Sequence, residues 1–386
     1  MRIGIDARTL SYEYTGIPIY VHDTIKYWNE KYTDHEFFLF SNRDFQLDFS
    51  LKRNWHIVID KHRFGTLWVH HRLHKLLKEY EVDVFWEPMN FLPKRISGIR
   101  YIVTVHDLAV FLHPEFGAIT DVITERLLLK KSCRSADRII AISQATKNDI
   151  KKYLGVRDEK ISVIYNGDSP YTGKTPSYKN IEQDEVLDRW NLKEKEFFLF
   201  VGTIEPRKNI ETIVKAFEKF KEKTSYLKKL VLVGKSGWKN SKIYNLIENS
   251  KFSKDIVLTG YVTEMEKECL YRNASALVFP SFHEGFGFPI VEAMSVGIPV
   301  ITSRISSMPE VGGDAAIYLD ESQISDADAL ERVMEDVSGF SQIKIDEICK
   351  QSFEQASKFS RKNGAEKIFE IITMKGGEIY GKNSNR

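Results

Sequence analysis

The chain contains only three cysteines in 386 residues, namely Cys133, Cys269 and Cys349, and none of them forms a CxxC pair. This spacing favours neither a disulfide framework nor a zinc site. Neither sign of charge is in excess, because 56 basic and 54 acidic side chains leave a formal charge of +2. Dedicated nucleic-acid-binding proteins usually show a strong basic excess, so we expect no nucleic-acid partner.

Long apolar runs are also missing. No segment approaches the roughly 18 consecutive apolar residues that indicate a membrane-spanning helix. The first residues, 1–6, read directly as a strand and lack the apolar stretch of a signal peptide. We therefore expect a cytoplasmic protein.

Two familiar nucleotide-binding patterns are absent as well. The sequence has no P-loop. The pair Gly285 and Gly287 is followed by Phe288, Pro289 and Ile290, so it does not complete a GxGxxG motif. This departure argues against a dinucleotide-dependent oxidoreductase.

The sequence contains one DxD pair, Asp326-Ala327-Asp328, the arrangement with which many nucleotide-sugar enzymes hold a divalent metal. The pair follows Ser325 at the start of a helical pattern, where acidic side chains complement the helix dipole. We interpret it as helix-start chemistry, and we predict no metal and no other cofactor.

What the sequence does contain is an alternation of short apolar runs with helical patterns. Such alternation predicts βαβ units and parallel sheets covered on both faces. The pattern breaks near residue 166 and the chain stays polar to about Asp184, which indicates a linker. Strands are predicted at 3–6, 36–40, 55–59, 82–86, 101–105, 138–142 and 161–164, and then at 197–201, 229–233, 256–259, 276–279, 300–303 and 316–319.

The two series predict two Rossmann-like α/β domains, residues 1–175 and 185–359. Open sheets of this kind bind ligands at the carboxyl ends of their strands. Two such domains facing each other would form an interdomain cleft.

The most informative segment is the glycine-containing loop from Glu284 to Glu292. Ionised carboxylates only accept hydrogen bonds, so they suit the vicinal hydroxyl groups of a sugar or a ribose. Gly285 and Gly287 allow close backbone approach, and Pro289 predicts a helix start whose free amides favour phosphate. We place Glu292 in the first turn of that helix. The alternative is an exposed loop with an ordinary first-turn glutamate.

Further charged side chains lie at other predicted strand ends. Arg207 offers a planar fork for phosphate and Lys208 a point charge, at a strand-to-helix junction of the second domain. A solvated charged turn is the alternative. In the first domain His106 and Asp107 follow the strand at 101–105, where a purely structural histidine is the alternative.

These segments resemble a known family. The sequence HEGFGFPIVEAM, from 283 to 294, is similar to the E-x7-E motif of retaining glycosyltransferase family 4, which has the GT-B fold. The sequence GTIEPRKN, from 202 to 209, resembles the donor-phosphate site of its bacterial mannosyltransferase-like members. The resemblance implies that Glu284 contacts the transferred sugar and Glu292 the ribose. The amides of Gly285, Phe286 and Gly287 would bind sugar hydroxyls and phosphate.

The resemblance also implies roles for the remaining candidates. Arg207 and Lys208 would neutralise the leaving diphosphate. His106 would position the donor sugar and stabilise the transition state, and Asp107 would orient the imidazole or reach the acceptor. Some members carry an arginine where this chain has Thr203.

Two loops complete the implied donor site. Tyr261 and Val262 would lie against the nucleobase, largely through backbone groups. Gly16 would lie close to the donor phosphate, although this chain has GIPIY where the usual pattern is GIGRY.

Taken together, the resemblance implies a GT-B protein, with two Rossmann-like parallel-sheet domains facing a deep interdomain cleft. The first would bind the acceptor and the second the nucleotide sugar, and residues 360–386 would cross back to the first. The implied reaction moves mannose from GDP-mannose, with retention, to a saccharide or lipid-linked saccharide. The alternatives are a transferase using UDP-glucose or another UDP-sugar, and a catalytically silent binding or scaffold subunit.

One helix, predicted at 66–80, is both basic and aromatic, with Trp68, His70, His71, Arg72, His74 and Lys75. It suggests either peripheral association with an anionic membrane surface, at its cytoplasmic face, or contact with a lipid-diphosphate acceptor. The alternative is an ordinary amphipathic helix that packs its leucines inward.

Overall fold

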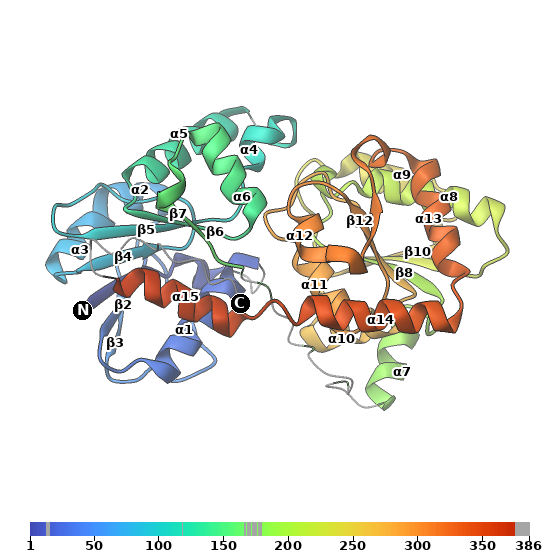
Figure 1. The fold of residues 1–386 in the computed structure, drawn as a ribbon, viewed down its shortest axis with the longest axis horizontal. Coiled ribbons are helices and arrows are strands. Elements are labelled where there is room, and N and C mark those ends of the chain that lie inside the picture. The colour runs from blue at the N-terminus through green and yellow to red at the C-terminus, as the bar shows by residue number, and fades with distance from the viewer. Residues whose placement is uncertain are drawn as a thin grey trace. The chain divides into compact units, whose positions relative to one another are not determined.

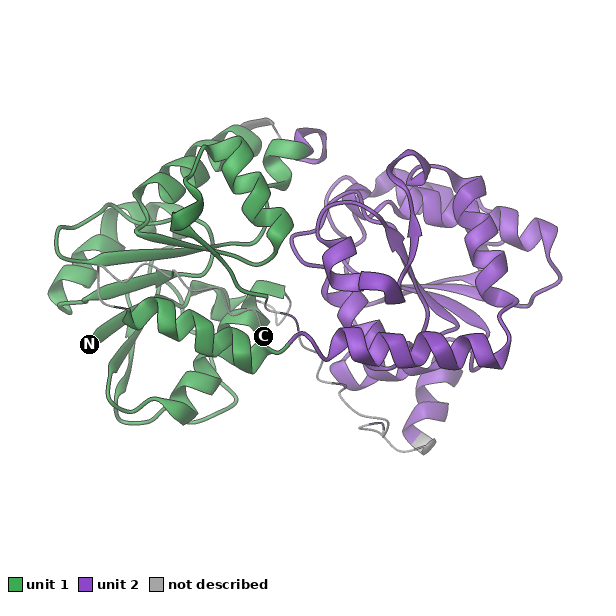
Figure 2. Ribbon diagram, in the orientation of Figure 1, with its two compact units in different colours: residues 1–112, 119–166, 360–386 green, residues 113–118, 167–359 purple. Residues whose placement is uncertain are grey.

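A computed structural model describes residues 1–374 apart from 13–15, 118, 166, 168–170, 172–175 and 177–179. The chain divides into two compact units (Figure 2). Unit 1 comprises residues 1–112, 119–166 and 360–386, and unit 2 comprises residues 113–118 and 167–359.

Unit 1 is built on a seven-stranded parallel sheet with the order β3-β2-β1-β4-β5-β6-β7. Strands β1 and β4 are neighbours in the sheet. Strands β2 and β3 therefore lie on one side of β1, and strands β4 to β7 lie on the other side. The strands are β1 (Arg2–Asp6), β2 (Glu36–Ser41), β3 (Trp55–Ile59), β4 (Val84–Glu87), β5 (Arg100–Val105), β6 (Arg138–Ala141) and β7 (Ile161–Val163).

Both faces of this sheet are covered, as the apolar strands require (Figure 1). Residues of alternating parity point to opposite faces, so Phe37 packs with one core and Phe38 with the other. One face carries α1 (Gly16–Lys31) and α15 (Arg361–Thr373). The other carries α2 (Gly65–Trp68), a π-helical stretch (Val69–Leu73), α3 (His74–Glu79), α5 (Ile119–Ser135) and the segment from α6 (Gln144–Asp149) through a second π-helical stretch (Ile150–Leu154). Helix α4 (Ala109–Leu112) contacts α5.

The last helix, α15, belongs to unit 1 although the segment before it belongs to unit 2. Trp28 of α1 donates its indole N–H to the Ala365 carbonyl at 2.8 Å, and Arg361 pairs with Asp23 at 2.6 Å. These contacts fix the returning chain on α1.

Unit 2 is built on a six-stranded parallel sheet with the order β10-β9-β8-β11-β12-β13. Its strands are β8 (Phe197–Val201), β9 (Lys229–Val233), β10 (Ile256–Gly260), β11 (Ala276–Phe279), β12 (Val300–Ser303) and β13 (Ile317–Leu319). Its helices are α7 (Asn180–Arg189), α8 (Ile210–Lys223), α9 (Ser241–Glu248), α10 (Glu264–Asn273), α11 (Phe288–Ser295), α12 (Met308–Gly312), α13 (Ala327–Ser338) and α14 (Gln342–Ala356). Every predicted strand is present in the two sheets.

Two expectations about the chain's organisation need correction. Residues 180–184, assigned to the linker, begin helix α7. Residues 113–118, assigned to the first domain, group with unit 2. There Lys239 donates to the carbonyl oxygen of Glu115 at 2.9 Å, and the Phe116 ring stacks on Phe282 with centroids 5.9 Å apart.

Within the described part of the chain, no helix is both long enough and apolar enough to cross a membrane.

Candidate functional site

The topology of unit 2 identifies where a ligand would bind. Strands β8 and β11 are adjacent, while the chain proceeds from β8 to β9 on one side and from β11 to β12 on the other. In open α/β sheets such a switch point opens a crevice at the carboxyl ends of the strands. The loops that follow β8 and β11 are those with the predicted cations and with Glu284.

The loop after β8 is fixed to the end of β11 by a side chain that the sequence analysis did not single out. Asn209 adopts a left-handed conformation with φ 59°, directly before α8. Its side-chain amide donates to the carbonyl oxygens of Pro280 at 3.0 Å and Ile324 at 2.7 Å. Asparagine tolerates this conformation better than most residues, so one side chain closes the turn and links three segments.

The predicted cations and the first glutamate form one cluster. Lys208 Nζ lies 2.6 Å from Glu284 Oε1, and Arg207 Nη1 lies 3.5 Å from Glu284 Oε2. Arg207 also donates to the His283 carbonyl at 2.7 Å and pairs with Glu205 at 2.9 Å. A lysine ammonium has three N–H donors, so Lys208 keeps donors for an incoming phosphate.

Electrostatics keep Glu284 ionised. Burial by itself disfavours the charged carboxylate, but Lys208 and Arg207 outweigh burial, and the pKa of Glu284 is lowered. The side chain is 9% exposed. It is therefore an ionised acceptor in a largely dry site, where hydrogen bonds to it are stronger than in water.

The glycine loop is held by hydroxyl groups from the neighbouring loop after β12. Ser306 Oγ donates to the Glu284 carbonyl at 2.6 Å, and Ser307 Oγ lies 2.9 Å from the same oxygen and 2.8 Å from the Phe286 carbonyl. Gly287, with φ 99°, precedes α11, a conformation that favours glycine. The Phe286 ring is buried, so any ligand contact from this residue would come from its backbone.

Glu292 lies elsewhere than predicted. Helix α11 begins at Phe288, so Glu292 is its fifth residue and falls just beyond the first turn. Its carboxylate does not compete for the free amides of the helix start. Instead it points to α10, where Tyr271 donates to Oε2 at 2.8 Å and Lys267 Nζ lies 3.1 Å from Oε1.

Lys267 and Tyr271 link Glu292 to a second polar network, separate from that of Glu284. Lys267 also lies 3.1 Å from Glu264. Burial opposes protonation of Lys267, but Glu292 and Glu264 raise its pKa. Burial raises the pKa of Tyr271, which therefore stays a hydrogen-bond donor. Glu292 is held between two donors and still has lone pairs for a diol.

The predicted nucleobase loop follows β10. Gly260 has φ 70°, and the Tyr261 side chain is 55% exposed with Lys235 Nζ 4.9 Å from its ring centroid. Val262 is buried. Tyr261 thus offers an open ring face beside a cation, whereas Val262 offers its backbone.

In unit 1, His106 lies at the carboxyl end of β5. Its Nε2 is 2.7 Å from the Pro88 carbonyl oxygen, so Nε2 carries the proton and Nδ1 is an acceptor. The Tyr20 ring meets the imidazole edge-on at 5.3 Å. Burial lowers the pKa of His106, which favours the neutral ring.

Asp107 does not hold the imidazole. Its Oδ1 accepts from the Ala109 amide at 3.0 Å and so caps the short helix α4, while the Pro88 carbonyl fixes His106. Of the predicted loop near the donor phosphate, Gly16 is the first residue of α1 with φ 40°, and residues 13–15 lie outside the described part.

Family models match both halves of the chain. The model described as "Glycosyltransferase Family 4" matches residues 14–168, and the model described as "Glycosyl transferases group 1" matches residues 182–344. The chain thus contains a glycosyltransferase family 4 domain followed by a glycosyl transferases group 1 domain.

Curated relatives of this chain include two bacterial enzymes. The chain is 32% identical over 249 residues to O-antigen chain mannosyltransferase B of Escherichia coli, a match that covers 64% of each chain. It is 30% identical over 218 residues to O-antigen chain mannosyltransferase RfbU of Salmonella typhimurium, covering 56% of each. Each match spans less than two thirds of the relative's length.

Solved structures support the GT-B fold of this chain. WaaG, a glycosyltransferase involved in lipopolysaccharide biosynthesis, superposes with a TM-score of 0.74 at 15% identity, covering 97% of this chain and 100% of WaaG. Alr3699/HepE of Anabaena, in a complex with UDP and glucose, gives 0.73 at 16% identity, covering 97% and 99%. The predicted fold class is confirmed.

The DxD pair at residues 326–328 lies at the start of a helix. Asp326 precedes α13 and its carboxylate accepts from the amides of Asp328 at 2.8 Å and Ala329 at 3.2 Å. Within the described ranges, no group of three or more His, Cys, Asp or Glu side chains is placed to hold a metal ion.

Several residues that complete the site carried no recognised motif. Lys267 and Tyr271 are four apart on one helix, a spacing that places both on one face, but their partner Glu292 is more than twenty residues away. Ser306 has a positive φ of 52° although it is not glycine, a feature visible in the structure but not in the sequence.

Proposed function

We propose that this chain is a retaining hexosyltransferase that moves mannose from GDP-mannose to a hydroxyl group of a saccharide or lipid-linked saccharide. The observation that carries the proposal is the ionised cluster of Lys208, Arg207 and Glu284 at the β8/β11 switch point. The mannosyltransferase names of the two O-antigen relatives support mannose as the transferred sugar. A UDP-sugar such as UDP-glucose is the alternative donor.

In the proposed mechanism, Lys208 and Arg207 bind the diphosphate and stabilise the negative charge that grows as the glycosidic bond breaks. Positive groups placed in advance cost no reorganisation when that charge develops. The free amides at the start of α11 add to this field. These groups supply the charge that a metal would otherwise supply, so we propose metal-independent transfer.

Glu284 would accept hydrogen bonds from hydroxyl groups of the transferred sugar. His106, with a neutral ring and an acceptor at Nδ1, would accept one further hydroxyl and so position the sugar. The acceptor hydroxyl would attack from the same face as the departing phosphate. The leaving diphosphate would take the proton of that hydroxyl group, and the attack from the same face would preserve the anomeric configuration.

Glu292 would accept both hydroxyl groups of the ribose, with Tyr271 and Lys267 fixing its orientation. The exposed ring of Tyr261 would lie beside the base. We propose that the reaction takes place at the cytoplasmic face of a membrane, where lipid-linked saccharides are found.

A panel of sugar nucleotides tests the proposal. We expect hydrolysis or transfer with GDP-mannose that exceeds turnover of UDP-glucose, unaffected by EDTA, and an axial product anomer by proton NMR when the donor is axial. Turnover of a UDP-sugar alone would establish the alternative donor. If no donor turns over and neither GDP nor UDP raises the melting temperature, the chain is not a transferase. If a nucleotide binds without turnover, it is a silent binding subunit.

A further inference from the structure

Residues 113–118 group with unit 2, whereas α4 before them and α5 after them group with unit 1. The chain thus passes from one unit to the other and back within this short segment, which we call the strap. The proposed mechanism gives the strap no role. Its contacts with the rest of unit 2 are of two kinds, one through aromatic rings and one through main-chain carbonyl groups.

The ring contacts lie directly before the first glutamate of the glycine loop. The Phe116 ring stacks on the Phe282 ring, with centroids 5.9 Å apart and planes 25° apart. The His113 ring meets the His283 ring at 5.9 Å and also stacks on Phe116 at 5.5 Å. Phe282 and His283 immediately precede Glu284 in the sequence. The strap therefore packs on the chain that leads from β11 to this carboxylate.

The main-chain contacts come from a single lysine. Lys239 Nζ donates to the carbonyl oxygens of Glu115 at 2.9 Å and Gly117 at 3.2 Å. Lys239 has φ 54°, a left-handed conformation that is uncommon for a residue with a side chain. Such a conformation persists where the surrounding structure holds it.

The turn that carries Lys239 is itself held by hydrogen bonds. The Asn240 side-chain amide donates to the Ser236 hydroxyl at 2.6 Å and to the Gly237 carbonyl at 2.8 Å. The Gly237 amide in turn donates to the Ile204 carbonyl at 3.0 Å. Ile204 belongs to the loop after β8, which carries the cations of the proposed site. Lys239 therefore fixes the strap to a defined turn at the same edge of the sheet.

The residues beneath the strap are also bonded to the cationic loop. The Phe282 amide donates to the Arg207 carbonyl at 3.0 Å, and the Arg207 guanidinium donates to the His283 carbonyl at 2.7 Å. The main chain of Phe282 and His283 is thus bonded to Arg207, while their rings pack on the strap. In a close-packed structure, a shift of these rings would move the main chain that leads to Glu284.

We propose that the strap positions Glu284 for the transfer reaction, with Phe116 and Lys239 as positioning residues that act through the chain at Phe282 and His283. A misplacement of about 1 Å caused far from the reacting atoms can cost about 10²-fold in rate. The inference rests on the proposed function, in which Glu284 accepts hydrogen bonds from the transferred sugar. It adds to that function a segment that contacts neither donor nor acceptor in the proposed mechanism.

Amide hydrogen exchange, measured by mass spectrometry on the full chain, tests whether the strap holds this loop and needs no substrate. We expect Phe116→Ala and Lys239→Met to speed exchange in the peptide 281–288 about 2- to 10-fold, the factor that one aromatic pair contributes. Exchange in β11 should not change. Phe116→Tyr keeps the ring and Lys239→Arg keeps the donors, so both should exchange like the parent chain.

Steady-state kinetics with the preferred donor measure the consequence for Glu284. We expect kcat to fall about 10- to 100-fold in Phe116→Ala and Lys239→Met. The KM for the donor and the Kd for its nucleoside diphosphate should stay unchanged. Among the described residues, neither Lys208 nor Glu292 forms a hydrogen bond or ion pair with the strap. Phe116→Tyr and Lys239→Arg should retain the kcat of the parent chain.

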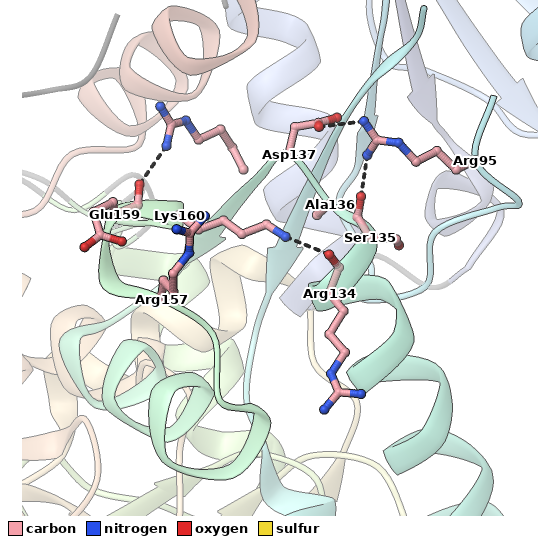
Figure 3. Close-up of a pocket in the computed structure, with 9 residues that line it drawn as sticks. Arg95, Arg134, Ser135, Ala136, Asp137, Arg157, Glu159 and Lys160 are labelled. Carbon is pink, nitrogen blue, oxygen red and sulfur yellow. Dashed lines mark hydrogen bonds and ion pairs between the residues drawn. The ribbon is translucent and has the colours of Figure 1, made fainter. Parts of the chain in front are cut away.

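Unit 1 offers a matched control in a pocket of about 500 Å³ (Figure 3). There Lys160 Nζ donates to the carbonyl oxygens of Cys133 at 2.9 Å and Arg134 at 2.8 Å, so one lysine again holds two main-chain acceptors. Lys160 directly precedes β7 and Asp137 directly precedes β6, which places the pocket at the amino ends of the strands. Lys160→Met should lower the melting temperature but leave kcat and exchange at 281–288 unchanged.

Four results would overturn the proposal. The first is unchanged exchange at 281–288 in both strap variants, and the second is faster exchange there with an unchanged kcat. The third is a failure of Phe116→Tyr and Lys239→Arg to keep the parent values. The fourth is a lower melting temperature with faster exchange throughout unit 2, which would make the strap merely structural. If the parent chain turns over no donor, the proposed function fails, and the exchange result alone decides whether the strap holds the Glu284 loop.

Discussion

The two sheets place a cation and carboxylates at equivalent positions, yet the two clusters differ in access to solvent. At the β1/β4 switch point of unit 1, Arg8 lies 2.7 Å from Asp6 and 3.9 Å from Glu87, with side chains 4%, 2% and 0% exposed. At the β8/β11 switch point of unit 2, Lys208 and Glu284 are 2.6 Å apart with side chains 12% and 9% exposed.

The difference in exposure separates a cluster that is enclosed by protein from one that is more open to solvent. The guanidinium of Arg8 is surrounded by protein, with Asp6 on one side and the Trp68 ring 5.9 Å away. The Lys208 ammonium has one carboxylate partner from the neighbouring loop and further donors. Under the proposed function, similar chemistry at similar points of the two sheets would serve stability in unit 1 and ligand recognition in unit 2.

The largest expected effect on stability concerns the buried cluster of Arg8, Asp6 and Glu87 in unit 1, which we call the closed cluster. Arg8→Leu leaves Asp6 and Glu87 buried without their cation, and breaking a buried pair in this way costs about 3–5 kcal/mol. Urea unfolding followed by tryptophan fluorescence measures it well, because Trp28, Trp55 and Trp68 are among the tryptophans of unit 1.

The control for this substitution is Arg2→Leu, since Arg2 pairs with glutamates at the surface and should lose at most about 1 kcal/mol. GDP should still bind the Arg8 variant under folding conditions. A loss in stability no larger than that of the control would mean that the closed cluster is not structural.

We call the group formed by Lys208, Arg207 and Glu284 in unit 2 the open cluster. Substitutions there should change catalysis more than stability. Glu284→Gln removes the charge that accepts from the sugar, and we expect kcat to fall about 10²- to 10³-fold, as for other preorganised contacts at a reacting centre. Affinity for the nucleoside diphosphate should not fall, because Lys208 loses a competing partner. Steady-state kinetics and calorimetry with GDP measure the two effects.

The matched control for Glu284 is Glu205→Gln, which removes a carboxylate that pairs with Arg207 alone among the cluster's cations. It should change kcat much less. If Glu284→Gln reduced nucleotide affinity as strongly as kcat, the division of roles between Glu284 and Glu292 would be wrong.

The same contrast explains what the sequence could predict. Glu284, Arg207 and Lys208 lie in two short contiguous motifs at predicted strand ends, so both the loops and their meeting point were predictable. Asp6 and Glu87 are about eighty residues apart, and no local pattern indicates that β1 and β4 pair. Pairing between distant strands depends on the tertiary fold, which local spacing does not encode.

Local sequence patterns also place the starts of helices only approximately. The helix after the glycine loop was predicted to begin at Pro289, one residue late, and that shift placed Glu292 in the first turn. Helix ends commonly vary by one or two residues, but here one residue decides whether the carboxylate lies at the helix start. The polar composition of 180–184 hid the start of α7, because a surface helix needs few apolar residues.

A smaller effect is expected for the second glutamate of unit 2. Tyr271→Phe removes one donor to Glu292 and keeps the buried ring, so the fold should persist. A hydrogen bond to a charged group is worth about 1.5–3 kcal/mol, and Lys267 still holds the carboxylate. We expect the KM for the donor to rise about tenfold, corresponding to about 1.4 kcal/mol, with kcat nearly unchanged.

A merely structural role for Tyr271 would give a different result, with a lower melting temperature and a loss of kcat in proportion to the unfolded fraction. Tyr244→Phe, in α9, is a control that should leave both KM and kcat unchanged.

The smallest effect on the free energy of unfolding is expected for Glu87→Gln. This substitution should reduce the loss of stability at higher pH, whereas Arg8→Leu should lower stability. Burial raises the pKa of Glu87 well above its usual range, and the charge of Asp6 together with a hydrogen bond to Asp6 adds to the shift, so the protonated form is favoured. A carboxyl group that holds its proton more tightly when folded stabilises the fold at low pH. This stabilisation decreases as the pH rises from the unfolded pKa, about 4.3, through the folded pKa.

Glu87→Gln keeps both hydrogen bonds, because the amide N–H can donate to Asp6 and the amide oxygen can accept from Met89, as Glu87 does at 2.9 Å. At pH 4 we expect the variant to lie within about 1 kcal/mol of the parent chain, the net size of one hydrogen bond. Above that pH the variant should lose less stability than the parent, in unfolding curves measured from pH 4 to 8. A steeper decline in the variant would show that Glu87 is ionised beside Arg8, and the closed cluster would then be a charged pair with the same protonation as the open one.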